Sequence, residues 1–235
     1  MNVIITGASR GIGLETARAF LGIPHLRLGI IARNKAKLTE FAAMHVKNDR
    51  ELIPLPFDLE KNIASVGKIT GRIREHFSQV DILINNAGMM LHKPFEELDY
   101  RDYTKVFNLN FFSPALLIRA LLPFLEKSET RHVVNIGSMG GFQGSIRFPG
   151  LTLYSASKAA LSNLTESLAT EYREKGIRFN CLALGAVQTE MLTETFPGYR
   201  TPVSAEDMGR YIRDFSMTAY RFMNGKVIPL SLSAP

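Results

Sequence analysis

The sequence predicts an α/β fold in which helices cover both faces of a parallel sheet. Short apolar runs that are typical of buried strands alternate with longer stretches of helical periodicity along the 235 residues. Glycine and polar motifs directly follow several of these runs, at the carboxyl ends of the expected strands, where open parallel sheets bind ligands. A hydrophobic content of 46% is enough for a sizeable core, so we expect one domain over residues 1–235.

The first strand is expected at residues 2–6, and a helical pattern runs from residue 14 to residue 21. The chain between them reads Thr6-Gly7-Ala8-Ser9-Arg10-Gly11-Ile12-Gly13. Gly7 would permit a tight turn, Gly11 a close approach of the backbone to a pyrophosphate, and Gly13 close packing of the helix on the sheet. The helix N-terminus supplies free N–H groups and partial positive charge. This context favours nucleotide binding over an ordinary turn.

The second strand, at residues 26–32, is followed by Arg33 and Asn34. In a dinucleotide fold this strand end lies beside the adenosine ribose, where an acidic residue would bind the ribose hydroxyls of NAD. Arg33 can instead pair with a 2′-phosphate, and Arg10 can reach the same group. The sequence therefore predicts NADP(H) as the cofactor.

The remaining patterns complete the alternation of strands and helices. Further strands are expected at residues 52–57, 81–85, 132–136, 178–184 and 227–230. Further helices are expected at residues 35–45, 63–77, 103–125, 154–175 and 205–217, the last capped by Ser204. Residues 139–153 are glycine-rich and predict a loop, and Gly176 is the stop signal of the helix before it.

Tyr154 and Lys158 are the pair around which the chemistry is expected to be organised. Residues four apart on a helix share one face, which would put the Lys158 ammonium beside the Tyr154 phenol. An adjacent cation stabilises a phenolate, so we expect Lys158 to lower the pKa of Tyr154 from its ordinary value of about 10. Such a phenol can give a proton to a carbonyl oxygen or take one from an alcohol.

Two further residues stand out within apolar sequence. Asn110 requires a buried partner or a bound water, because its neighbours are Phe107, Leu109, Phe111 and Phe112. Cys181 is the only cysteine, so no internal disulfide can form, and its apolar surroundings indicate a buried structural thiol. The five histidines are scattered, so we expect no structural metal.

The net charge of +6 and the pI of about 9.5 admit a nucleic acid, a membrane surface or a phosphorylated ligand as partner. The basic residues form no long block, so nucleic-acid binding is not expected as a main role. No run of 18 apolar residues exists, so we expect no transmembrane helix and no membrane partner. The absence of a signal-peptide pattern and the single cysteine predict a cytoplasmic protein.

These motifs together resemble the short-chain dehydrogenase/reductase family over essentially the whole chain. The matching features, in order, are Thr6-Gly7-x3-Gly11-x-Gly13, Asp58, Asn85-Asn86-Ala87-Gly88, Asn110, Ser138, Tyr154-x3-Lys158 and Gly185-x3-Thr189. The resemblance implies a Rossmann-like, doubly wound sheet of seven parallel strands. It also implies an oxidoreductase that transfers a hydride between a nicotinamide and a carbonyl or alcohol group.

By this resemblance, Tyr154 is the general acid and Ser138 donates a hydrogen bond to the substrate oxygen. Lys158 would also hold the nicotinamide ribose, and Asn110 would position a water that relays protons to Lys158.

The resemblance also implies the cofactor contacts. Asp58 would contact the adenine ring, Asn86 would lie beside the adenosine ribose and brace the central strands, and Val187 and Thr189 would hold the carboxamide. The full set of expected contacts is Gly7, Ser9, Arg10, Gly11, Ile12, Gly13, Arg33, Asn34, Asp58, Leu59, Asn86, Ala87, Gly88, Tyr154, Lys158, Gly185, Val187 and Thr189.

The chain departs from the family pattern at three places. Leu184 precedes Gly185 where the family has proline. Ser138 and Tyr154 are 16 residues apart, a few more than usual, which predicts an insertion near residues 147–150 that faces the substrate cleft. The segment after residues 225–230 lacks the Asp-Gly-Gly-like tail that is common in fatty-acid reductases.

We therefore expect an NADPH-dependent reductase of a small-molecule ketone or aldehyde, of the sepiapterin-reductase or another small carbonyl reductase type. Two alternatives stay open: a 3-oxoacyl-[acyl-carrier-protein] reductase, and a catalytically silent NADP-sensing regulator. The pocket is expected to be lined by apolar side chains, namely Phe142, Phe148, Leu151, Met191, Leu192 and Phe196. The family forms its dimer face from the helices at residues 103–125 and 154–175, which predicts a homodimer or homotetramer.

Overall fold

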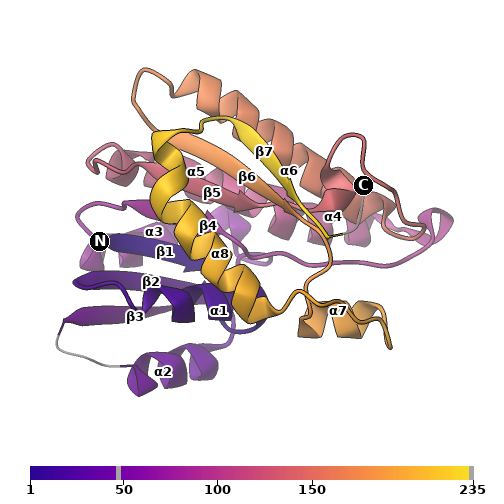
Figure 1. Ribbon diagram of the computed structural model, residues 1–235, viewed down its shortest axis with the longest axis horizontal. Helices are drawn as coiled ribbons and strands as arrows, with labels where there is room; N and C mark the ends of the chain where they lie inside the picture. The colour runs from indigo at the N-terminus through magenta and orange to yellow at the C-terminus, as the bar shows by residue number, and fades with distance from the viewer. Residues whose placement is uncertain (46–48, 233–235) are drawn as a thin grey trace.

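The computed structural model describes residues 1–45 and 49–232. Its centre is a sheet of seven parallel strands in the order β3-β2-β1-β4-β5-β6-β7 (Figure 1). The strands are β1 (Asn2–Thr6), β2 (Leu26–Ala32), β3 (Arg50–Pro56), β4 (Ile82–Asn85), β5 (His132–Ile136), β6 (Arg178–Leu184) and β7 (Lys226–Leu230). The strand order reverses between β1 and β4, which confirms the doubly wound α/β fold and creates a switch point for ligand binding.

Helices cover both faces of the sheet. α1 (Gly11–Phe20), α2 (Lys35–Met44) and α8 (Ala205–Thr218) pack on one face, and α3 (Val66–His76), α5 (Ser113–Leu125) and α6 (Thr152–Glu171) pack on the other. In Figure 1, α8 crosses in front of the sheet and α6 lies behind it. Within β1, Val3 and Ile5 enter the first core and Ile4 enters the second. Both faces of a parallel strand are buried, which explains why these strands are continuous apolar runs rather than alternating ones.

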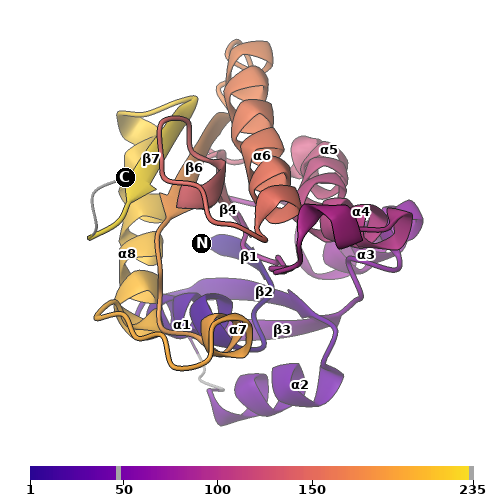
Figure 2. The ribbon, with the colours of Figure 1, turned by 90° about the vertical axis from the view of Figure 1, so that its right-hand side faces the viewer.

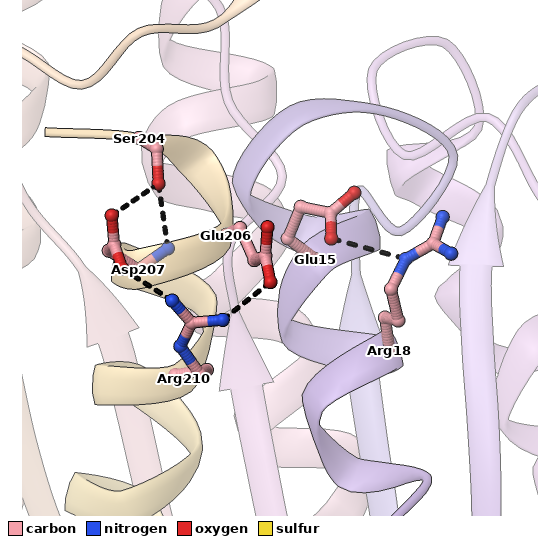
Figure 3. A network of polar contacts seen from close by, with 6 residues as sticks. All are labelled: Glu15, Arg18, Ser204, Glu206, Asp207 and Arg210. Atoms are coloured by element: carbon pink, nitrogen blue, oxygen red, sulfur yellow. Dashed lines mark hydrogen bonds and ion pairs between the residues drawn. The ribbon is translucent and has the colours of Figure 1, made fainter.

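α8 lies directly against α1. A Cβ atom on Gly209 would lie 2.5 Å from the carbonyl carbon of Glu15, so only glycine permits this approach of the two helices. Ser204 caps α8 as expected, because its hydroxyl accepts a hydrogen bond from the backbone N–H of Asp207 at 3.0 Å. Figure 3 shows this cap, with Arg210 on the next turn bound to Asp207 and Glu206.

The helix expected at residues 103–125 has three parts. α4 (Tyr100–Phe107) begins earlier than expected, because Asp99 and Asp102 form a reciprocal capping box. A π-type turn at Asn108–Phe112 separates it from α5, whose second residue is Pro114. Within the described ranges, Tyr100–Leu125 is long and apolar enough to cross a membrane by length and composition, with 39% of its apolar window buried. That test also selects core helices, and α5 buries Leu117 and Leu121 in the core.

Other boundaries differ from the expectations by a few residues. The helix expected from residue 63 begins as a 3-10 turn, Ile63–Ser65, and becomes α-helical at Val66. α6 begins at Thr152 and ends at Glu171, earlier than expected, and Gly176 then adopts a φ of +71°. A short helix, α7 (Glu190–Thr195), was not expected; Thr189 caps it by accepting a hydrogen bond from the N–H of Leu192.

Candidate active site

A cavity of about 650 Å³ opens at the carboxyl ends of the strands. Figure 2 looks onto this edge of the sheet, with α7, the N-terminal end of α6 and α4 arranged around the strand ends. The cavity is lined by the glycine loop and by the segments that follow β2, β3, β4, β5 and β6. All the expected site residues line it except Asp58 and Asn110.

The glycine loop has the geometry expected of a phosphate cradle. Gly7 has a φ of +70° and Gly11 a φ of +55°, a region that glycine adopts at little cost. A Cβ atom on Gly13 would lie 2.3 Å from the carbonyl oxygen of Gly7, so the first turn of α1 lies directly against the loop. Arg10, which precedes the helix, makes no side-chain cap. The N-terminal N–H groups of α1 therefore adjoin the cavity, and the site fits the diphosphate of a dinucleotide.

Cationic side chains gather around this end of the cavity. Arg10, Arg33 and Lys37 all line it, and Asn34 caps α2 by accepting a hydrogen bond from the N–H of Lys37. Arg33 is 65% exposed and lies 3.6 Å from a carboxylate oxygen of Glu60. The exposed guanidinium is available for a phosphate.

Arg10 has a partner that the sequence did not reveal. Its Nη1 and Nη2 donate to the two carboxylate oxygens of Glu194, on α7, at 2.5 and 3.2 Å. This hydrogen-bonded pair raises the pKa of Arg10 and lowers that of Glu194. The pair ties the glycine loop to α7.

Asn86 braces the central strands as expected. Its Nδ2 donates to the carbonyl oxygen of Thr6 at 3.0 Å, and its backbone N–H donates to the Thr6 hydroxyl at 3.0 Å. Asp58 does not line the cavity, and its expected contact with an adenine ring stays a prediction. Its Oδ1 instead accepts hydrogen bonds from the N–H groups of Glu60 and Lys61. This carboxylate stabilises the turn after β3, while Leu59 lines the cavity.

Ser138, Tyr154 and Lys158 meet on one wall of the cavity. Ser138 follows β5 directly, and its hydroxyl accepts a hydrogen bond from the N–H of Gly140 at 3.2 Å and is hydrogen-bonded to the Tyr154 hydroxyl. Tyr154 and Lys158 are both buried in the first turns of α6. The ammonium of Lys158 donates to the carbonyl oxygen of Ile136 at 2.8 Å. The three residues thus come from two elements and form one polar cluster.

The pKa of Tyr154 differs from the expectation. Burial raises the pKa of the phenol, and the hydrogen bond to Ser138 opposes this increase only in part. Burial also lowers the pKa of Lys158 to about 8. The pKa of Tyr154 is thus raised and not lowered as expected, because desolvation dominates, and the opposing contribution comes from Ser138 rather than from Lys158. A phenol with a raised pKa is protonated at neutral pH and can act as an acid.

Asn110 is fully buried in the π-type turn and has the polar partners that its sequence context requires. Its Oδ1 accepts from the N–H of Met89 at 2.9 Å, and its Nδ2 donates to the Met89 carbonyl and to the Ser157 hydroxyl, both at 3.0 Å. A Cβ atom on Gly88 would lie 3.3 Å from both Asn110 Oδ1 and Lys158 Nζ. Asn110 therefore positions the chain after β4 and lies close to the lysine.

The segment after β6 completes the cavity. Gly185, Val187 and Thr189 line it, together with Leu184 at the position where the family has proline. Cys181, earlier on β6, is fully buried as expected, and burial raises the pKa of its thiol to about 11.

The part of the cavity beside Tyr154 has an apolar lining. Of the residues expected there, Phe148, Leu151, Met191, Leu192 and Phe196 line it and Phe142 does not. The cavity lining also includes five apolar or aromatic residues that the sequence analysis did not name: Met89, Met90, Met139, Ile146 and Tyr199. Of residues 147–150, where an insertion was expected, Phe148 lines the cavity, and the neighbouring Ile146 lines it as well.

Comparison with known proteins agrees with this geometry. The family model described as short chain dehydrogenase matches residues 1–200. The chain belongs to this family. It is 29% identical over 205 residues to an uncharacterized oxidoreductase of Staphylococcus saprophyticus, with 87% of this chain and 86% of that protein covered. The protein is thus an oxidoreductase of the short-chain dehydrogenase/reductase family.

Solved structures of the family share the fold. A short chain dehydrogenase from Shigella flexneri complexed with NADP superposes with a TM-score of 0.87 at 26% identity, covering 97% of this chain and 95% of that one. A 3-ketoacyl-(acyl-carrier-protein) reductase from Brucella melitensis complexed with NADH gives a TM-score of 0.82 at 24% identity, covering 97% and 96%. Structures of this fold have thus been determined with NADP and with NADH, and the comparison does not distinguish between the two cofactors.

Proposed function

We propose that this protein reduces a ketone or aldehyde to an alcohol with NADPH. The observation that carries the proposal is the meeting of Ser138, Tyr154 and Lys158 on the wall of the cavity into which the glycine loop opens. A fold that only held a nucleotide would not need a half-buried hydroxyl, a buried phenol and a buried ammonium together beside it.

The residues of the cavity fit a nicotinamide dinucleotide. The N-terminal N–H groups of α1 would hold the diphosphate, and Arg33, with Arg10 and Lys37, would hold a 2′-phosphate. Val187 and Thr189 would contact the carboxamide, and Lys158 the nicotinamide ribose. When bound, the cofactor supplies the hydride, and the protein supplies orientation and the proton.

Tyr154 would give its proton to the carbonyl oxygen as negative charge develops there. Burial keeps this phenol protonated at neutral pH, because it raises the pKa. Ser138 would donate a second hydrogen bond to the same oxygen. The Lys158 ammonium, held by the carbonyl of Ile136, would stabilise the phenolate that remains. Asn110 would act as a positioning residue through Met89 and Ser157, with a water-mediated proton relay to Lys158.

The family dimer face corresponds to α4, α5 and α6 in this structure. Phe112, which precedes α5, is 47% exposed, and Tyr103 on α4 is 36% exposed. We propose that these side chains are covered in a homodimer or homotetramer of a cytoplasmic enzyme. Sedimentation analysis of wild type and of Phe112→Ser would test this, and a monomeric wild type would contradict it.

The test of function is a screen for carbonyl-dependent oxidation of NADPH. The oxidation is monitored as a decrease in the absorbance of the reduced nicotinamide. The panel contains ketones, aldehydes and an acetoacetyl thioester of acyl carrier protein. We expect turnover with free ketones or aldehydes. Binding of NADPH by calorimetry without turnover of any carbonyl would contradict the proposal and favour a nucleotide-sensing role.

A further inference from the structure

We infer that the substrate is an uncharged carbonyl compound with an apolar tail, and that Ile146, Phe148 and Tyr199 hold this tail at the mouth of the cavity. This inference rests on the proposed function, because it names the substrate class of the same site. It depends on three features of the described residues: the placement of charge along the cavity, the exposure of three apolar side chains, and the contacts that hold their loops.

Apart from the buried Lys158, the charged side chains of the cavity lining lie toward its glycine-loop end. Its charged lining residues are Arg10, Arg33, Lys37, Lys158 and Glu190. Arg10 belongs to the glycine loop, and a Cβ atom on Gly11 would lie 3.4 Å from Glu190 Oε2, which places this carboxylate at the same end. Lys158 is buried and bonded to the carbonyl of Ile136. The lining beside Tyr154 thus offers no free cation or carboxylate to a charged substrate group.

The uncharged lining includes thioether, aliphatic and aromatic side chains: Met89, Met90, Met139, Leu151, Met191 and Phe196. Three of them lie at the Tyr154 end, because Met89 is hydrogen-bonded to Asn110, Met139 follows Ser138 and Leu151 directly precedes α6. Methionine side chains are flexible and polarisable, so they adapt to apolar groups of varied shape. A charged group placed here would be desolvated without a partner, which is strongly unfavourable. The lining therefore selects against charged substrates as well as for apolar ones.

Three apolar side chains line the cavity and are nevertheless exposed. Ile146 is 54% exposed, Phe148 is 55% exposed and Tyr199 is 53% exposed. Ile146 and Phe148 belong to the loop before α6, and Tyr199 follows α7. Because these side chains continue the apolar lining outwards, an apolar tail that leaves the cavity would cover them and remove their surface from water.

The segment after β4 holds the loop before α6 and the end of α7 in place. The N–H of Lys93 donates to the carbonyl oxygen of Gly150 at 2.9 Å. A Cβ atom on Gly150, whose φ is +76°, would lie 2.7 Å from the His92 ring. His92 also contacts Phe196: the two ring centroids lie 5.2 Å apart in an edge-on arrangement. The segment after β4 thus fixes both the loop before α6 and the end of α7, so the mouth is formed before a ligand arrives.

The test is a series of straight-chain methyl ketones of increasing length, assayed with NADPH. We expect kcat/KM to rise about threefold to fourfold for each added methylene, the usual effect of burying one such group. A short ketone that carries a carboxylate close to its carbonyl, within the lining beside Tyr154, should be a poorer substrate than the uncharged ketone of equal length by about tenfold or more, because that lining offers the charge no partner. A flat series, or a preference for the charged ketone, would overturn the inference.

Phe148→Ser and Phe222→Ser are the matched variants. Both replace an exposed phenylalanine, but Phe222 is 84% exposed and lies outside the cavity lining. Phe148→Ser should flatten the increase, so that the ratio of kcat/KM between the longest and the shortest ketone falls well below that of wild type. Phe222→Ser should behave like wild type throughout. If Phe148→Ser instead dissociates an oligomer and leaves the chain-length dependence intact, the mouth is a subunit interface and the inference fails.

Calorimetric titration with straight-chain 2-alkanols separates this inference from the proposed function. The affinity should rise with chain length in wild type and less so in Phe148→Ser, whether or not the protein turns over any ketone. Turnover that fails while this dependence holds would refute the reductase and keep the apolar tail site. Affinity that does not change with chain length would overturn the tail site even in an active reductase.

Discussion

The two ends of the cavity are built in different ways. At the glycine-loop end the shape comes from the backbone: positive φ angles, missing Cβ atoms and a helix N-terminus fixed against β1. At the carbonyl end it comes from side chains on loops, with methionine and aromatic residues and an inserted segment before α6. A backbone-built site admits one ligand chemistry, whereas a side-chain-built site can change its substrate through substitutions that leave the fold intact. Each prediction below separates one end from the other.

Tyr154→Phe should have the largest effect and should act on one end alone. We expect turnover to fall by about two to four orders of magnitude, the usual contribution of a positioned acid. The affinity for NADPH should stay within a few-fold of wild type, since the glycine loop is unchanged. Steady-state kinetics and calorimetry together check this. Near-normal turnover would exclude Tyr154 as the acid.

Arg33→Asp should act on the other end. Two guanidinium groups on one 2′-phosphate predict a preference of wild type for NADPH over NADH of about 100-fold. The substitution should abolish this preference and leave the range of accepted carbonyl compounds as it is. Titration of both cofactors is the measurement, and equal affinities in wild type would contradict the roles given to Arg33 and Arg10.

Glu194→Gln sharpens the same prediction. In the structure Glu194 binds Arg10, so a phosphate must compete with this carboxylate. Removing its charge should strengthen NADPH binding by a small factor, about twofold to fivefold, because exposed ion pairs are weak. NADH binding should not change. Weaker binding of NADPH by this variant would show that the pair supports the site rather than competing with the phosphate.

Gly13→Ala tests whether the backbone itself builds the glycine-loop end. The added methyl would meet the Gly7 carbonyl oxygen at 2.3 Å, so we expect a loss of about 2–3 kcal/mol of folding free energy and weak cofactor binding. Gly71→Ala in α3 is the matched control, since its Cβ would meet nothing within 4 Å. It should stabilise the protein by about 0.5–1 kcal/mol. Denaturant titration distinguishes the two, and equal stabilities would contradict the packing described.

Lys158 lies between the two ends, and its deprotonation gives a gradual effect that grows with pH. Burial lowers its pKa to about 8, so the ammonium is present below this pH and is lost as the pH rises through it. The pKa of Tyr154 is raised, so the phenol stays protonated over the same range. We expect kcat/KM for NADPH, which reports groups of the free enzyme, to fall about tenfold per pH unit above about pH 8. A flat profile up to pH 10 would contradict this.

The backbone of the fold was largely predictable because buried parallel strands leave a clear pattern. β1, β2, β5 and β6 are largely apolar, and their boundaries agree with the expectations. β4 and β7 begin one residue from the expected positions and β3 begins two residues early, where polar residues enter the pairing. The start of α4 was missed, although Asp99 and Asp102 stand three residues apart as a capping box requires.

The site was predictable where it depends on local backbone and not where it depends on distant partners. The glycine loop and the Tyr154–Lys158 spacing are short-range signals. The ion pair between Arg10 and Glu194 joins residues 184 positions apart, and no local sequence pattern predicts it. The pKa of Tyr154 was misjudged for the same reason, since the burial of the phenol is a property of the assembled cavity.

The π-type turn at Asn108–Phe112 makes the candidate site sensitive to the number of residues in this helical segment as well as to their identity. Such a turn holds one residue more than an α-helical turn, so the helix carries a surplus residue at this point. Deleting one residue there would let α4 and α5 join as a regular helix and would rotate one against the other by about 100°. Asn110 would then turn away from Met89 and Ser157, and the chain beside Lys158 would lose its support. The number of residues between α4 and α5 is therefore as important to the candidate site as the identity of the residues that line the cavity.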